Sequence, residues 1–184
     1  MKATGIVRRI DELGRIVIPK EIRRTLRIRE GAPLEIFTEQ NGEVILKKFS
    51  PIGELSENAH EMVEALSQVL GLPSAITDRD TFIASAGIGK RDLSGRAVSD
   101  EIMRSISSRS KISSLGAGST NLMLTDEVDP SAVANAVLLL PVVSAGDAIG
   151  SVLLFSQKPD VAIEPNAQKV LETAASFLGH QIEA

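Results

Sequence analysis

The stretch that most constrains the fold of this chain is a short apolar strand that runs directly into a basic helix. Residues 15–18 read Arg-Ile-Val-Ile, and three β-branched residues in a row favour a strand. Pro19 follows, and its fixed φ and missing N–H suit the first turn of a helix. On a helical wheel of about 100° per residue, four cations share one face and two apolar side chains lie opposite. The cations are Lys20, Arg23, Arg24 and Arg27, and the apolar residues are Ile22 and Leu26.

The charge of this helix is poorly balanced. Glu21 is the one acidic residue among residues 19–27. Most charge runs are simply solvated faces, but four like charges held close together repel each other unless a polyanion is present. The imbalance therefore favours an anion-binding face.

The same asymmetry divides the whole chain. Residues 1–50 hold 11 Lys and Arg against 7 Asp and Glu, a balance of +4, whereas residues 51–184 hold 9 against 17, a balance of −8. A basic module joined to an acidic one indicates a polyanionic partner for the first module alone. No cysteine is present, which excludes disulfides, thiolate metal sites and a cysteine nucleophile. The most apolar run, residues 136–143, is shorter than the roughly 20 residues that cross a bilayer, so we expect a soluble cytoplasmic protein without a membrane partner.

The basic module reads as two hairpins around the helix. Residues 5–10 form one predicted strand, residues 11–14 a turn in which Gly14 can take a positive φ, and residues 15–18 the returning strand. The second hairpin turns at Asn41-Gly42, the strongest short hairpin signal, between strands at 34–39 and 43–49. A ββαββ unit of about 50 residues buries too little apolar surface to be stable as a monomer. We therefore expect an obligate dimer.

Residues 1–26 resemble the AbrB family of bacterial transition-state regulators almost residue for residue, including Gly-Arg-Ile-Val-Ile-Pro at 14–19 and the Arg23-Arg24 pair. The resemblance implies a swapped-hairpin β-barrel dimer that binds double-stranded DNA. It implies contacts from arginines matching Arg8, Arg15, Arg23 and Arg24, with basic neighbours helping. The predicted DNA-binding set is Arg8, Arg9, Arg15, Arg23, Arg24, Lys2, Lys20 and Arg27. The basic region has no aromatic residue on which bases could stack, which disfavours RNA.

A helix from about residue 52 to residue 70 follows, closed by Gly71. Its apolar residues are spaced 3, 4, 3, 4, 3 along the chain. This spacing suits either a helix that faces its own core or a parallel coiled coil, and dimerisation of the first module favours the coil. The apolar positions are Ile52, Leu55, Ala59, Met62, Leu66 and Val69.

The remaining residues alternate strands and helices. The predicted hairpin at 75–84 turns at 78–80, the predicted strand pair at 137–155 turns at 144–147, and a strand is predicted at 111–115. Helices are predicted at 95–109 and 164–182. This order resembles a GAF domain, a small-molecule sensor fold, so the predicted fold class is α+β, with an AbrB-like barrel before a GAF-like α/β/α domain. The predicted domains are 1–50, a connector at 51–72, and 73–184.

Function follows from these modules. The two histidines, His60 and His180, are isolated, so neither a metal site nor a catalytic triad is predicted, and we expect no enzyme and no cofactor. An unidentified small molecule could occupy a pocket between residues 83–88, 115–124 and the paired strands. By the resemblance, the chain is a nucleoid-associated regulator of sporulation that activates some forespore genes and represses others. Its connector and C-terminal helices would join two dimers into a homotetramer. An antitoxin-like partner of a protein toxin is the alternative.

Overall fold

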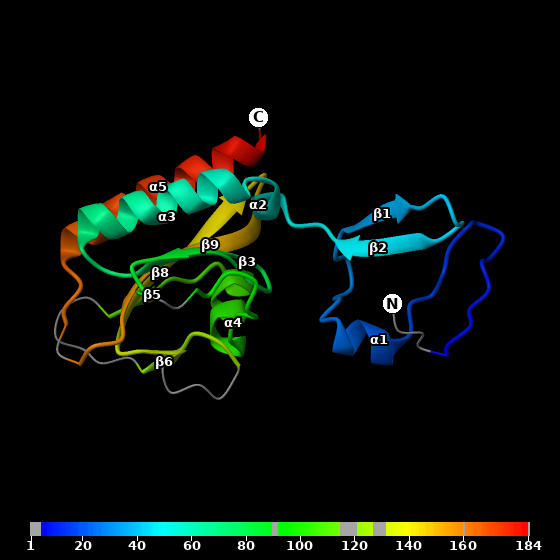
Figure 1. Ribbon diagram of the computed structural model, residues 1–184, viewed down its shortest axis with the longest axis horizontal. Coiled ribbons are helices and arrows are strands. Elements are labelled where there is room, and N and C mark those ends of the chain that lie inside the picture. The colour runs from blue at the N-terminus through cyan, green and yellow to red at the C-terminus, as the bar shows by residue number, and fades with distance from the viewer. Residues whose placement is uncertain (1–4, 90–91, 115–120, 127–131, 160, 184) are drawn as a thin grey trace. The chain divides into compact units, whose positions relative to one another are not determined.

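The computed structural model describes residues 5–89, 92–114, 121–126, 132–159 and 161–183, and it divides into two compact units (Figure 1). Unit 1 is Met1–Phe49 and unit 2 is Ser50–Ala184. The predicted connector therefore belongs to the second unit.

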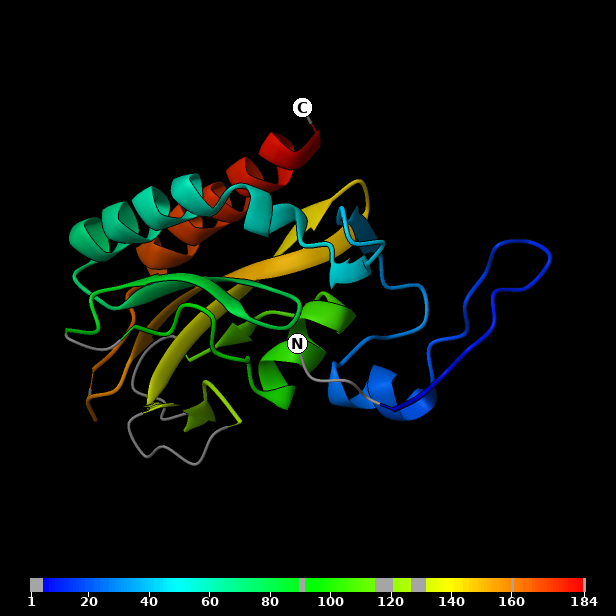
Figure 2. The same ribbon diagram turned by 45° about the vertical axis from the view of Figure 1, so that its right-hand side comes forward.

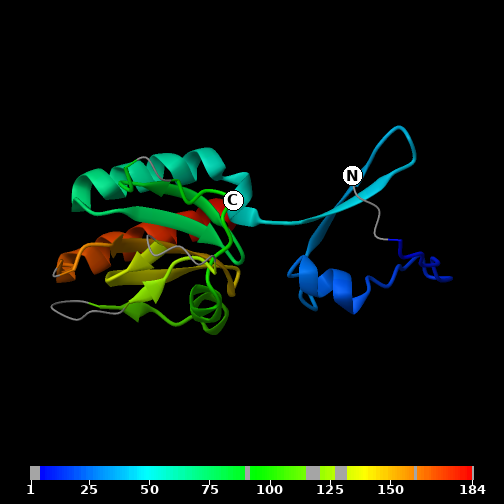
Figure 3. The same cartoon turned by 60° about the horizontal axis from the view of Figure 1, so that its bottom comes forward.

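Unit 1 contains the predicted basic helix and the second of the two predicted hairpins. Its elements are α1 (Lys20–Thr25), β1 (Leu34–Thr38) and β2 (Val44–Lys48). The two strands are antiparallel. Gly42 closes the turn at a φ of 78°, and its N–H donates to the Glu39 carbonyl at 3.0 Å. Figure 3 shows this hairpin as a twisted ribbon whose tip points away from α1.

The first predicted hairpin does not form in the single chain, so the ββαββ prediction is wrong for one copy. Its turn is present, because Gly14 has a φ of 76° and donates its N–H to the Asp11 carbonyl at 2.9 Å. No strand is assigned at residues 5–10 or 15–18, which Figure 2 shows as an open loop reaching away from α1. A two-stranded hairpin without a surface to pack on is at best marginally stable in water.

Unit 2 is built on a five-stranded antiparallel sheet in the order β4-β3-β9-β8-β5, with a separate pair of strands, β6 and β7. Its helices are α2 (Pro51–Glu54), α3 (Ser56–Leu70), α4 (Asp100–Ser108) and α5 (Pro165–Glu183). Its strands are β3 (Ser74–Asp78), β4 (Phe82–Ala86), β5 (Ile112–Ser113), β6 (Leu122–Met123), β7 (Val133–Ala134), β8 (Ala136–Ser144) and β9 (Asp147–Ser156).

The sheet lies between two helical layers. Helices α3 and α5 run side by side over one face, and α4 lies on the other (Figures 1 and 2). The buried apolar side chains form two matching clusters, because alternate residues of β8 and β9 point to opposite faces. Leu138 and Leu154 belong to the cluster under α3 and α5, whereas Leu139 and Phe155 belong to the cluster under α4.

The coiled-coil prediction for the connector is wrong. A kink at Leu55 separates α2 from α3, and the apolar side of α3 packs on the sheet. Ala59, Val63 and Leu66 are buried there, while Val69 at the predicted seam is 74% exposed. A 3-4 spacing fits a seam and a core-facing stripe equally, and the sheet already covers this stripe. Gly71 does end the helix in a left-handed conformation, as predicted.

The predicted C-terminal elements form with shifted ends. The predicted helix at 95–109 begins at Asp100, because the hydroxyl of Ser99 accepts a hydrogen bond from the Ile102 N–H at 3.4 Å and caps it. The β8–β9 hairpin turns through Ala145 and Gly146, both with positive φ. The predicted ligand pocket includes residues 115–120, which lie outside the described residues. No helix in the described part of the chain combines the length and apolarity that crossing a bilayer requires.

Candidate nucleic-acid interface

The basic helix α1 is shorter than the wheel assumed, and this removes Arg27 from it. The last helical residue is Thr25, Leu26 is the C-cap, and Arg27 takes a φ of 52°. The Ile28 N–H donates to the Arg23 carbonyl at 2.7 Å and the Arg27 N–H to the Arg24 carbonyl at 3.2 Å. These two bonds form a Schellman motif, whose left-handed position is usually glycine. The prediction that Arg27 shares the helical face is therefore wrong.

Arg15 is held by one residue of the preceding turn. The Asp11 Oδ2 accepts the Arg15 Nε–H at 2.8 Å, and Oδ1 accepts the backbone N–H of Arg15 at 2.8 Å and of Leu13 at 3.0 Å. The Arg15 bonds hold the pKa of the Asp11 carboxyl below its ordinary value, so Asp11 is ionised at neutral pH. The Arg15 side chain is nevertheless 70% exposed.

Arg23 makes a looser contact within its own chain. One of its terminal nitrogens lies 3.5 Å from Oε1 of Glu30, whose side chain is 92% exposed. An exposed ion pair of this kind contributes about 0–1 kcal/mol and is screened by salt. A phosphate can therefore displace Glu30 at little cost.

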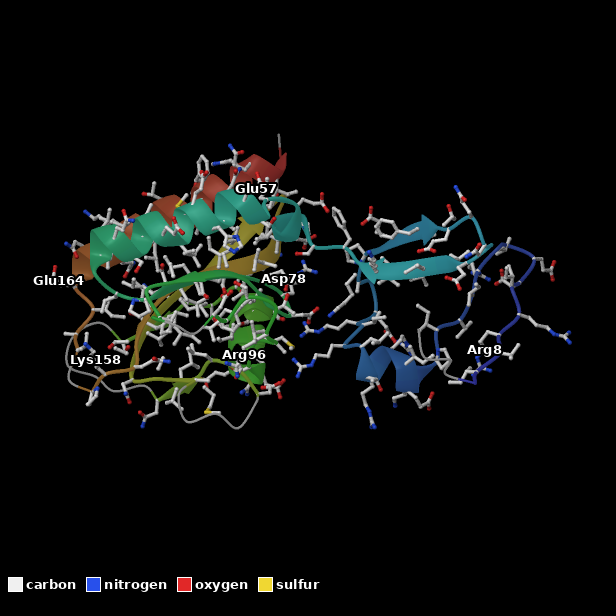
Figure 4. The ribbon with its side chains drawn as sticks, in the orientation of Figure 1. Arg8, Glu57, Asp78, Arg96, Lys158 and Glu164 are labelled. Carbon is white, nitrogen blue, oxygen red and sulfur yellow. The ribbon has the colours of Figure 1, made fainter. Side chains whose placement is uncertain are left out.

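The other predicted contacts lie on the surface. Arg8, Arg9, Lys20 and Arg24 are exposed, and the structure gives them no ion pair with any described residue. Arg8 is labelled in Figure 4 on the extended segment of unit 1. Lys2 lies outside the described residues. Cations without an acidic partner keep their full charge for a polyanion.

Unit 1 has almost no core of its own. Of its described residues, 5–49, Pro19 alone is buried. Twelve large apolar side chains are exposed instead: Ile6, Val7, Ile10, Leu13, Ile16, Val17, Leu26, Ile36, Phe37, Val44, Leu46 and Phe49. This much exposed apolar surface in one small unit indicates that something else covers it.

The hairpin carries more of its large apolar residues on one face than on the other. Ile36 pairs with Leu46 across the ladder, and Leu34 and Val44 lie on the same side of the sheet because side chains alternate along a strand. The opposite side carries two apolar residues, Phe37 and its cross-strand partner Ile45, and the Lys47 ammonium lies 4.6 Å from the Phe37 ring centroid. We call the first side the apolar hairpin face.

The surface of unit 2 has a groove, and its described residues include no metal-binding cluster. The open groove, of about 470 Å³, is lined in part by Arg109, Lys111, Leu140, Pro141 and Glu172. Within the residues that the structure describes, no group of three or more His, Cys, Asp or Glu side chains could hold a metal ion.

Two residues of the site were missing from the sequence prediction. Asp11 contacts Arg15 and Glu30 contacts Arg23. From sequence alone, an acidic residue in a basic segment indicates only a lower net charge and no specific contact. The four-residue spacing of Asp11 and Arg15 across a glycine turn was the available signal.

Comparison with known proteins covers both units. Residues 54–183 match the family described as stage V sporulation protein T C-terminal, transcription factor, and residues 7–53 match the MazE antitoxin family. The chain is 48% identical over 183 residues to stage V sporulation protein T of Bacillus subtilis, covering 100% of this chain and 99% of that protein.

Solved structures match the two units separately. The N-terminal DNA recognition domain of the Bacillus subtilis transition-state regulator AbrB is 59% identical over 28% of this chain and 94% of its own, with a TM-score of 0.24. The GAF domain of PixJ from Thermosynechococcus elongatus is 13% identical over 74% of this chain and 89% of its own, with a TM-score of 0.57. The two family models, together with the fold shared with the GAF domain of PixJ, confirm the predicted fold class, an AbrB-type domain followed by a GAF-like domain. On the full-length match above all, the chain belongs to the stage V sporulation protein T family of transcription factors.

Proposed function

We propose that unit 1 binds double-stranded DNA as a homodimer and that this binding underlies the regulation of sporulation genes, some activated and others repressed. The observation that carries the proposal is the set of exposed cations at Arg8, Arg9, Lys20 and Arg24 in a segment 59% identical to a DNA recognition domain. A regulator with this partner acts at the nucleoid.

The apolar surface of unit 1 supports the dimer. A second copy is the partner of matching chemistry, because it brings the same apolar hairpin face and the same open segment at residues 5–18. Exchange of these segments between copies would complete the missing strand pairs and bury the exposed side chains. Two copies would also place two sets of cations in one assembly, which a duplex can neutralise.

Unit 2 supports a further level of assembly. On the outer sides of α3 and α5, Val69 is 74% exposed and Phe177 is 44% exposed. These side chains would be covered if two dimers met through their helices, which gives the proposed homotetramer. We also propose that unit 2 senses a small-molecule ligand, because its fold is that of a GAF domain.

The antitoxin function has one observation in its favour, the match of residues 7–53 to MazE antitoxins. It requires a tail that wraps a toxin without folding by itself. Residues 50–184 instead form a compact unit with two buried apolar clusters. The regulator function is therefore the better supported one.

The test is a titration of full-length protein with duplex DNA over a range of salt concentrations. If each dimer neutralises about 6–8 phosphates, the slope of log affinity against log salt is about −5 to −7. The Arg24→Ala variant should bind more weakly and with a shallower slope, at an unchanged unfolding midpoint.

The matched control is Lys158→Ala, which removes an exposed cation from unit 2 (Figure 4). It should leave both affinity and slope unchanged. Equal losses in the two variants, or a slope near zero for the wild type, would exclude the proposed interface.

A further inference from the structure

The carboxylate of Asp11 fixes both ends of Arg15. Its Oδ1 holds the backbone of Arg15 and its Oδ2 holds the guanidinium through Nε, each at 2.8 Å. All of these bonds lie within a five-residue turn of one chain. The result is an arginine whose long side chain is oriented before any partner arrives.

This geometry leaves the two terminal nitrogens of the Arg15 guanidinium available to contact DNA. The bond to Asp11 uses the Nε–H, one of five N–H donors, and the terminal nitrogens remain at the end of a side chain that is 70% exposed. A planar pair of terminal donors matches the O6 and N7 acceptors of guanine in the major groove. The neighbouring carboxylate repels a charged phosphate more strongly than the uncharged edge of a base.

Arg23 lacks this arrangement, which makes Arg15 distinct among the predicted contacts. Its single contact with Glu30 is 3.5 Å long, and that carboxylate is 92% exposed. A contact this loose does not fix the direction of a guanidinium. Arg23 therefore suits a phosphate, which accepts many approach directions.

We propose that Arg15, oriented by Asp11, reads a guanine base in the major groove, and that Asp11 is the positioning residue for this specificity. The proposal rests on the proposed function, because it assumes that unit 1 binds duplex DNA. It divides the basic set into one arginine that selects sequence and several cations that contact the backbone.

The test compares Asp11→Asn with Glu12→Gln in the full-length protein. Both variants remove one negative charge from the same exposed turn, but no hydrogen bond or ion pair joins Glu12 to Arg15, two residues that the structure describes. The carboxamide of Asp11→Asn can still accept the backbone N–H groups of Leu13 and Arg15 and keep the turn, whereas the charged contact with Nε is lost. Unfolding midpoints check that both variants fold.

Each protein first selects duplexes from a random library, and the selected site is then remade with 7-deazaguanine, which lacks the N7 acceptor, at each preferred guanine. We expect the wild type and Glu12→Gln to share one guanine whose modification weakens binding about tenfold or more. We expect Asp11→Asn to lose that preference, to tolerate the modification, and to bind unselected DNA at least as tightly as the wild type.

Two results would overturn the inference while leaving DNA binding intact: no preferred guanine in the wild type, or the same guanine preference in Asp11→Asn. A uniform loss of affinity in Asp11→Asn on every sequence would equally overturn it, because Asp11 would then support the turn alone. A wild type that binds no duplex at all would refute the proposed function itself.

Discussion

Truncation of Ile36 tests whether the apolar hairpin face is a dimer interface. Ile36 lies in β1, is 66% exposed in the single chain, and pairs with the exposed Leu46 of β2. Ile36→Ala removes three carbons, and burial of each is worth about 0.8 kcal/mol. Scaled to the 66% of Ile36 that the single chain leaves uncovered, the loss is about 1.6 kcal/mol per copy. Two copies in one dimer give about 3 kcal/mol, or a roughly two-hundredfold weaker association.

The assay is amide hydrogen exchange of the full-length protein over a range of concentrations, followed at residues 5–18. These residues carry no strand in the single chain and gain ladder hydrogen bonds only if a second copy pairs with them. The concentration at half-maximal protection should rise about two-hundredfold in Ile36→Ala. The substitution does not alter the proposed interface through α3 and α5, so the difference reports on unit 1.

Glu35→Ala is the matched control, since Glu35 neighbours Ile36 on the same strand but points to the opposite side of the sheet. Its half-protection concentration should stay within a few-fold of the wild type. If Ile36→Ala left the concentration dependence as it is in the wild type, the apolar hairpin face would not be the dimer interface. Its exposed side chains would then need another partner.

Two further predictions concern backbone positions. Arg27→Gly relieves the backbone strain of a left-handed non-glycine residue, so we expect unit 1 to gain about 0.5–1 kcal/mol in stability and its unfolding midpoint in calorimetry to rise. We expect duplex affinity in the salt titration to fall, because a cation is lost. A lower unfolding midpoint would contradict the Schellman motif at Arg27. Gly150→Ala places a Cβ 2.0 Å from the Thr77 carbonyl oxygen and 2.5 Å from Ile52 Cδ1. The free energy of unfolding of unit 2, measured by chemical denaturation, should therefore fall by about 1–3 kcal/mol. An unchanged free energy of unfolding would show that β3 and β9 can move apart to admit the methyl group.

Strong local signals in the sequence located several elements of the structure. The Asn41-Gly42 turn, Pro19 before α1 and Gly71 after α3 each impose a backbone conformation through their own chemistry. The second hairpin, the start of α1 and the end of α3 therefore formed where expected. Local patterns were weaker at helix ends. The wheel extended α1 to Arg27, because the spacing of the cations gives no sign that the backbone turns left-handed at that residue.

The DNA-binding site was predicted only as a set of charges. The basic residues of unit 1 follow from composition and spacing, but the hold of Asp11 on Arg15 depends on how a five-residue turn folds back on itself. The contact between Arg23 and Glu30 likewise joins residues on either side of the left-handed turn that ends α1. Side-chain contacts of this kind depend on the path of the backbone between them.

What the sequence determined by itself is the division into a basic and an acidic module, the AbrB-type character of the first fifty residues, and most strands and helices of the second module. Only tertiary structure decided which surface the apolar stripe of α3 meets, because a 3-4 spacing fits a partner helix and a sheet equally well. It also decided that residues 5–18 form no hairpin in one chain. Strand pairing there needs an apolar surface to pack on, and unit 1 exposes its apolar residues without enclosing any such surface.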